Sequence, residues 1–474
     1  MMMVYLFAVG LGSVIALSDW RMGLAVAIIL DCVRDPIRKM LPGEPTLVSF
    51  VICLIWGAAF VRVFFGGDRT LMFVRSRFPW IQKSMVLVVI GLIPGAMLSI
   101  ILYQNGFLLA GLGSASYAAP LIGLALGAAF VSDPKRLNQL MKLYVIVNSI
   151  ALTGCLAEWN GWDWPALGGM EGFNWIRYIE DGQVNLISGF FRSPDMAGFH
   201  AANAMMISAM LILRTLDMKR KLKVSPLWVS ALVWCSIPLI LCGRRKMMII
   251  PVVFVVAYLL YLQLATSRKV GPIVGFMFVI TLMTGLVLSI WRDEDSLQNH
   301  QAYVGTTVTD AVPRLQDNVI GGVATTLRQS GMFGSGLGVA TQGAQHLAPS
   351  ARRKSRAWQE DGVSRLFKEL GVPGVLFIMF AAFILSTNCL KAIKAQQYVQ
   401  LQDVQAAAFS IVMGNGASFV ISHQHFSGDP ANALWVLLFG GVFVGTLAMG
   451  VATKRKAMPT TSVHRQPAKL ARGI

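Results

Sequence analysis

Residues 84–103 read SMVLVVIGLIPGAMLSIILY and contain no charged side chain. A run of about 20 mostly apolar residues is the length that an α-helix needs to cross a bilayer. Such runs recur along the chain, and they are continuous rather than alternating, which argues against a β-barrel. The runs lie at 3–18, 22–34, 46–66, 84–103, 108–131, 141–159, 196–216, 226–242, 247–265, 271–291, 366–390, 403–422 and 432–453. Each is expected to form a membrane helix, except that a re-entrant or interfacial segment is the alternative for one of the first two, which are short.

The composition agrees with this pattern. Of 474 residues, 55% are hydrophobic and 14% are charged, whereas charged residues make up about a quarter of an ordinary soluble domain. The sequence therefore predicts an all-α polytopic membrane protein with about 12–13 transmembrane helices. Residues 1–453 are expected to form a single membrane domain, followed by a basic, disordered cytoplasmic tail over 454–474.

The net charge of +18 is carried by short basic tracts between the apolar runs. Clustering of Lys and Arg in cytoplasmic connections is the positive-inside pattern, so the tracts indicate membrane lipids rather than nucleic acid as partners. Counting back from a cytoplasmic tail predicts a short outer-face loop over 160–195 and a long one over 292–365. A conflict remains near the start. The tract 34–39 and the stretch 69–83 both look cytoplasmic, although one span separates them.

Three arginines lie where outer-face segments meet helices. Arg192 is followed by Ser193-Pro194, which is typical of a helix N-cap with proline in the first position. An arginine beside a helix N-terminus is a good anion site. Arg244 and Arg245 precede an apolar run. They lie on the predicted outer face, where the positive-inside rule expects few basic residues. They either extend toward lipid headgroups or bind pyrophosphate.

The long predicted loop holds further candidates. Gly334-Ser-Gly-Leu-Gly338 is either a flexible connector or a set of backbone N–H groups for phosphate. Arg314 and Arg365 are further candidate pyrophosphate ligands. Glu360, close to Arg365, is either a helix-capping acid or a general base, and His346 is a second candidate base.

Two other features carry open alternatives. His200, inside a predicted helix, is a functional group or a partner in an interhelical hydrogen bond. The aromatic residues of 160–191 form an interfacial belt or a sugar-stacking platform. Neither the histidines nor the six cysteines have the spacing of a common metal site, and no metal or cofactor is expected.

Together these features resemble the O-antigen ligase and O-antigen polymerase superfamily of bacterial membrane proteins. The resemblance is carried by Arg192 after Gly189-Phe-Phe, by Gly243-Arg244-Arg245, and by the long loop ending in Phe367-Lys-Glu369-Leu-Gly371-Val-Pro-Gly374. It covers about residues 190–375. Members often place a histidine about nine residues before the acid matched by Glu369, where this chain has Glu360-Asp-Gly-Val-Ser.

The resemblance implies a GT-C-like, metal-independent glycosyltransferase in the bacterial inner membrane, with its active face in the periplasm. Its donor would be an undecaprenyl-pyrophosphate-linked oligosaccharide and its acceptor a glycan, in exopolysaccharide or O-antigen biosynthesis. The missing histidine favours a polymerase over a lipid A-core ligase. Envelope polysaccharide assembly proteins are the expected partners. A lipid-linked oligosaccharide flippase or another transporter is the main alternative, although no internal repeat is visible. A non-catalytic assembly partner is a third.

Overall fold

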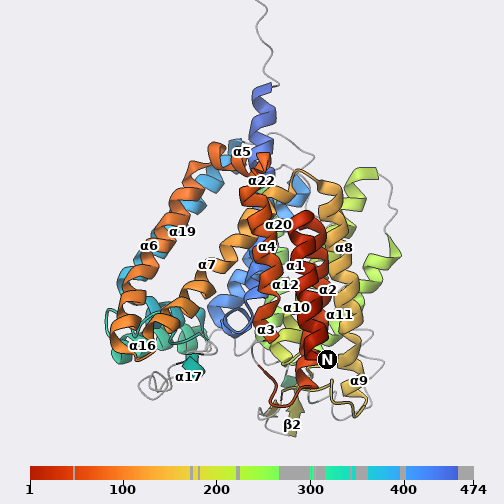
Figure 1. Cartoon of the computed structure of the whole chain (residues 1–474). Helices are drawn as coiled ribbons and strands as arrows, with labels where there is room; N and C mark the ends of the chain where they lie inside the picture. Colours follow the sequence, from red (N-terminus) through yellow and green to blue (C-terminus); the bar gives the residue numbers. More distant parts are fainter. Residues whose placement is uncertain are drawn as a thin grey trace, which may run out of the picture.

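The computed structural model describes residues 1–45, 48–170, 175–179, 182–219, 225–265, 299, 302–303, 305, 315–341, 344–347, 361–395 and 402–456. Over these residues the protein is almost entirely helical (Figure 1). Nine of the described helical stretches are long and apolar enough to cross a membrane, and two shorter apolar helices accompany them. The prediction of an all-α polytopic membrane protein is therefore confirmed. The predicted run at 271–291 lies outside the described residues.

The helices follow the predicted apolar runs closely. The long ones are α1 (Met2–Ser18), α2 (Trp20–Lys39), α4 (Cys53–Phe65), α6 (Pro79–Leu102), α7 (Gly106–Phe130), α8 (Pro134–Ala151), α10 (Pro194–Lys219), α11 (Pro226–Leu241), α12 (Arg245–Ala265), α19 (Gly362–Ala395), α20 (Gln402–Ile421) and α22 (Pro430–Lys456). Short elements join them: α3 (Val48–Val51), α5 (Arg69–Arg77), α9 (Thr153–Trp159), the π-helix η1 (Leu315–Gly321), α16 (Gly322–Ser330), α17 (Ala344–Leu347) and α21 (Gln424–Ser427). Strands β1 (Ile176–Ile179) and β2 (Gly182–Asn185) form an antiparallel hairpin.

The bundle has two distinct ends (Figure 1). One end, called the basic end below, carries α5 and the C-terminal end of α22. The other, called the loop end, carries the β-hairpin, α9, α16 and α17. At the basic end, Arg136 of α8 is paired with Asp19, which caps the N-terminus of α2.

The conflict near the N-terminus is resolved by the position of the tract 34–39. Lys39 Nζ donates to the backbone oxygens of Ala166 (3.3 Å) and Gly189 (2.9 Å), which places this tract at the loop end. The stretch 69–83 lies at the basic end, so the two tracts lie at opposite ends of the bundle and cannot both be cytoplasmic. The charge rule counts basic residues in exposed loops, whereas Arg34 and Arg38 are buried. Both short N-terminal runs are full helices that pack against each other.

Helices α7 and α22 pack backbone against backbone. A Cβ atom on Gly127 would lie 1.8 Å from Leu438 O, and one on Gly441 would lie 2.0 Å from Leu124 O. Small residues at four-residue spacing allow this approach in membranes, where close packing replaces the hydrophobic effect between helices. The contact fixes α7 to the centre of the main bundle.

Gly127→Val is therefore expected to destabilise the protein strongly, by about 3 kcal/mol or more, because no side-chain movement relieves a clash with a backbone oxygen. The measurement is thermal unfolding in detergent. Gly111→Val is the matched control, since Gly111 lies on the same helix and a Cβ atom there would meet no neighbouring atom within 4 Å. Equal melting temperatures for the two variants would contradict the close backbone packing of α7 on α22.

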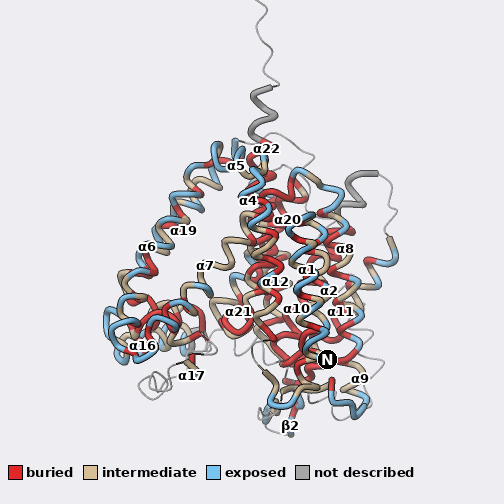
Figure 2. Tube along the Cα trace, viewed as in Figure 1, coloured by how far each residue is buried: buried red, intermediate tan, exposed pale blue. Residues whose placement is uncertain are grey.

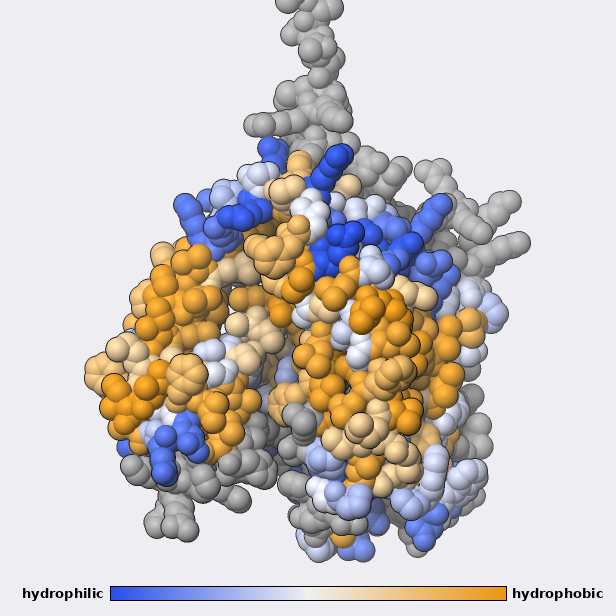
Figure 3. Space-filling model, in the orientation of Figure 1, coloured by the Kyte–Doolittle hydropathy of each residue, from blue (hydrophilic) through white to orange (hydrophobic). Residues whose placement is uncertain are grey.

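Helices α6 and α19 form an arm that leans away from the main bundle, with α16 packed on α19 (Figure 1). On the face shown in Figure 3, a hollow with mostly apolar walls separates this arm from the bundle. Buried residues concentrate in the main bundle, whereas the arm is exposed along much of its length (Figure 2). Its exposed side chains include apolar ones such as Ile101 (74%) and Phe383 (64%), as expected for surfaces that face lipid.

The segment 331–341 inserts into the arm. Leu337 N donates to Gly95 O (2.8 Å), Ser335 N donates to Lys368 O (2.6 Å), and Ser99 Oγ donates to Leu337 O (2.7 Å). Gly336 has φ +109°, and a Cβ atom there would lie 2.5 Å from Ser99 Oγ. These glycines therefore serve close packing, and the N–H groups of Ser335 and Leu337 have partners within the chain. The structure thus supports neither a flexible connector nor a phosphate cradle at this position.

Candidate functional site: buried ion pairs beside a basic helix start

An ion-pair cluster lies buried in the main bundle toward the loop end. Arg34 contacts the carboxylates of Asp31 (2.8 Å), Asp35 (3.4 Å) and Asp429. Arg192 Nη2 lies 3.7 Å from Asp429 Oδ2, and its backbone N–H donates to Asp35 Oδ2 at 3.0 Å. The Arg34 side chain is 1% exposed and that of Asp429 is not exposed at all. Buried charges of this kind persist only when they are paired.

Local signals in the sequence position these side chains. Ser193 Oγ accepts from Met196 N (3.4 Å), which confirms the predicted N-cap of α10 and places Arg192 just ahead of the helix. Asp429 stands before Pro430 and accepts from Ala431 N (3.2 Å), so the same carboxylate caps α22 and pairs with arginine. A helix start thus holds each of the two groups in place.

A second cluster surrounds the start of α12. Arg244 Nη2 lies 2.8 Å from Asp195 Oδ2, and Lys246 Nζ lies 3.0 Å from Asp195 Oδ1. Lys246 also donates to Ser422 Oγ (2.7 Å). The Arg245 guanidinium lies over the Tyr303 ring, 4.2 Å from its centroid. We call Arg244, Arg245 and Lys246 the Arg244 step.

The Arg244 step has the properties of an anion site. It forms the first turn of α12, while Asp195 lies in the first turn of α10, so two positive helix ends meet there. The side chains of Arg244 and Lys246 keep 11% and 15% exposure. Arg244 Nε is buried and has no hydrogen-bond partner within the described part of the chain. A tetrahedral anion would supply the acceptor that this donor lacks.

The predicted arginines fall into two groups. Arg192, Arg244 and Arg245 all lie at the starts of α10 and α12, as expected. Arg365 lies in the arm instead, where it contacts Glu369 (3.2 Å) and stacks over Tyr117 (5.0 Å). Its side-chain partners among the described residues come from α7, α19 and the 331–341 segment.

Glu369 completes a polar network inside the arm. It accepts from Tyr117 Oη (2.7 Å), from Ala340 N (2.9 Å) and from Thr341 Oγ1 (3.0 Å). The Arg365–Glu369 pair therefore joins α7, the 331–341 segment and α19. Arg365 as a pyrophosphate ligand stays a prediction, and its contacts point to a structural role.

The remaining predicted residues are only partly located. Glu360 and Arg314 lie outside the described residues. The backbone of His346 is in α17 at the loop end, but its side chain lies outside the described part. His200 donates to or accepts from Tyr144 Oη through Nδ1 (3.0 Å), so the interhelical hydrogen bond, one of the two predicted alternatives, is present.

The aromatic segment ahead of α10 has both exposed and buried rings, and both of its predicted roles stay predictions. Trp162 (69%) and Tyr178 (76%) are exposed at the loop end, while Phe191 is buried. The Arg244 guanidinium lies 5.3 Å from the centroid of the Trp175 ring. This segment thus contributes both exposed rings and a wall of the Arg244 step.

Sequence reasoning misses several members of the two clusters. It places Arg34 and Arg38 in a cytoplasmic loop, and it singles out neither Lys246 nor Asp429 as a site residue. One signal is present in the sequence, because Arg34-Asp-Pro-Ile-Arg38-Lys39 contradicts the topology count. When a basic tract contradicts the positive-inside rule, burial of its side chains in a site is a better explanation than an error in the number of spans.

His425 of α21 contributes a pH-dependent element. Its Nε2 lies 3.2 Å from Ser418 Oγ. Burial, reinforced by the nearby charge of Lys246, lowers the pKa of His425 from 6.5 to about 3. Because the unfolded chain binds this proton near pH 6.5 and the folded chain does not, the stabilisation is complete above about pH 6.5 and is lost as the pH falls toward 3. The melting temperature of His425→Gln should therefore fall less steeply with acidification than that of the parent; parallel curves would contradict this assignment.

Comparison with known proteins adds no assignment. No protein-family model matches the chain, and no curated protein is significantly similar to it.

Proposed function

We propose that the protein is a membrane glycosyltransferase that lengthens a glycan by transferring repeat units from an undecaprenyl-pyrophosphate carrier. The observation that carries the proposal is the Arg244 step, where cationic side chains and two helix starts converge at the loop end of a membrane bundle. A leaving pyrophosphate develops negative charge, and fixed guanidinium groups at a low-dielectric boundary stabilise it.

In the proposed mechanism, the pyrophosphate, the acceptor proton and the prenyl chain are each bound by a different part of the protein. Arg244 and Arg245, with Lys246 beside them, bind the pyrophosphate. A base removes the proton of the acceptor hydroxyl as its oxygen attacks the anomeric carbon and the C–O bond to pyrophosphate breaks. Glu360 and His346 remain the candidates for that base. The apolar hollow beside the arm suits the prenyl chain of the donor (Figure 3).

The proposal places the protein in a bacterial inner membrane with the loop end in the periplasm. Polymerisation is favoured over transfer to lipid A-core, because the histidine usual in ligases is replaced by Glu360-Asp-Gly-Val-Ser. Envelope polysaccharide assembly proteins and a glycan acceptor are the partners that this activity requires.

The deciding experiment supplies the purified protein, reconstituted in vesicles, with donor carrying one lipid-pyrophosphate-linked repeat unit. Longer lipid-linked glycans on gel electrophoresis, with release of undecaprenyl pyrophosphate, are the expected result. Movement of intact donor across the vesicle membrane without any lengthening would replace the enzyme by a flippase. If the donor is neither lengthened nor moved, both proposals lose their support.

A further inference from the structure

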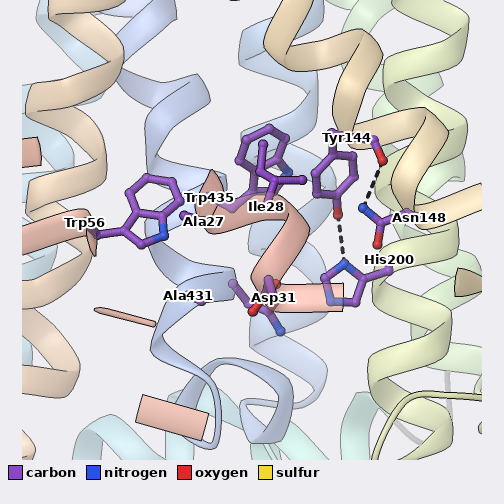
Figure 4. A pocket seen from close by; sticks show the side chains of 10 residues that line it. Ala27, Ile28, Asp31, Trp56, Tyr144, Asn148, His200, Ala431 and Trp435 are labelled. Carbon is purple, nitrogen blue, oxygen red and sulfur yellow. Dashed lines mark hydrogen bonds between the residues drawn. The ribbon is translucent and has the colours of Figure 1, made fainter. Parts of the chain in front are cut away.

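A small cavity with both apolar and polar lining residues lies inside the main bundle, next to the Arg34 cluster (Figure 4). The space open to the centre of a water molecule is about 20 Å³, which holds one or two waters and no sugar. Residues from α2, α4, α8, α10 and α22 line it. The polar members are Asp31, Tyr144, Asn148, His200 and Asn432.

Two ionisable groups, Asp31 and His200, line this cavity and can form further hydrogen bonds there. Figure 4 shows the His200 ring below Tyr144 at the level of Asp31. His200 is 4% exposed, and its Nδ1 is occupied by Tyr144. Because Nδ1 is taken by Tyr144, Nε2 is the ring nitrogen that can serve the cavity. The Asp31 side chain is 16% exposed, while those of Arg34, Asp35 and Asp429 are 3% exposed or less.

The carboxylates beside the cavity are unevenly paired with arginine, and this favours a proton on the least paired one. Arg34 and Arg192 contact three carboxylates, those of Asp31, Asp35 and Asp429. The next cation, Arg38, donates instead to Ser49 Oγ (3.0 Å) and to Glu44 O (3.0 Å). Asp429 contacts both arginines, and Asp35 has the charge of Lys39 nearby in addition to Arg34. Among the described cations, Asp31 contacts Arg34 alone, and a poorly paired negative charge is costly in a buried site. Asp31 is the carboxylate with access to water.

We infer that this cavity is a hydrated proton-binding site, in which one or two waters connect the Asp31 carboxylate to His200 Nε2. A proton taken up from solvent through the cavity water forms an O–H bond on Asp31, and the ion pair with Arg34 is weakened in the same step. The charged and titratable groups around Asp31 that set its proton affinity are Tyr5 on α1, Cys32, Arg34 and Asp35 on α2, Cys53 on α4, Tyr144 on α8, Arg192 ahead of α10, His200 on α10 and Asp429 ahead of α22.

Infrared difference spectroscopy of the purified protein, titrated with acid in detergent, tests this inference without any glycan substrate. The C=O stretch of a buried protonated carboxyl should appear as the pH falls, and Asp31→Asn should remove it. Asp163→Asn, at an exposed loop position, is the matched control and should keep the band. The same carboxyl band in Asp31→Asn as in the parent would overturn the inference.

His200→Gln supplies a second, independent measurement should Asp31→Asn fail to fold. It retains the carboxyl but removes the imidazole across the cavity, so the midpoint of the Asp31 band is expected to shift by about one pH unit. An unchanged midpoint in a folded His200→Gln protein would show that cavity water does not connect the two groups. Because neither measurement involves sugar transfer, their failure would leave the proposed function unaffected.

Discussion

Arg244→Ala is expected to reduce glycan lengthening by about 100-fold or more, the usual effect of removing one preorganised group that stabilises a leaving anion. Arg244 Nε is a buried donor without a hydrogen-bond partner among the described residues, and it lies between two helix starts. Folding should survive the change, because Asp195 keeps its contact with Lys246 at 3.0 Å. The loss should appear in turnover rather than in expression or membrane insertion.

The measurement is the rate of chain lengthening with a purified lipid-pyrophosphate donor, read together with thermal stability. Arg77→Ala is the matched control, since Arg77 is a basic residue near the surface of α5 at the opposite end of the bundle (Figure 1). Arg192→Ala is expected to combine loss of lengthening with loss of stability, because Arg192 belongs to the buried cluster. Full activity of a doubly substituted Arg244→Ala, Lys246→Ala protein would remove the Arg244 step from the mechanism.

The helices were predictable from the sequence because their cause is local. An apolar run such as 84–103 is stable in lipid as a helix, and the length of the run determines the length of α6. The N-cap at Ser193 is also local, and it placed Arg192 correctly. Each of these features depends on residues within a few positions of one another.

The composition of the site was harder to predict, because it depends on contacts between distant segments. Arg34 and Asp429 are 395 positions apart and carry no signal of their pairing. The segment 334–338 shows the opposite error, since glycines typical of a phosphate loop here permit Leu337 to pack against Leu92 and Leu370. A glycine in the sequence indicates that the backbone approaches another group closely, but only the folded structure shows whether that group is a ligand or another part of the chain.

Asp429→Ala is expected to destabilise the protein by about 3–5 kcal/mol, the usual cost of removing one partner from a buried charge pair. The substitution removes the carboxylate that Arg34 and Arg192 share, and it also removes the cap of α22. Thermal unfolding in detergent measures the effect, and Asp163→Ala, at an exposed loop position, should leave the melting temperature unchanged. If Asp429→Ala melts at the same temperature as the parent protein, the cluster is not the electrostatic centre of this bundle, and the charged neighbours proposed to set the proton affinity of Asp31 do not interact strongly.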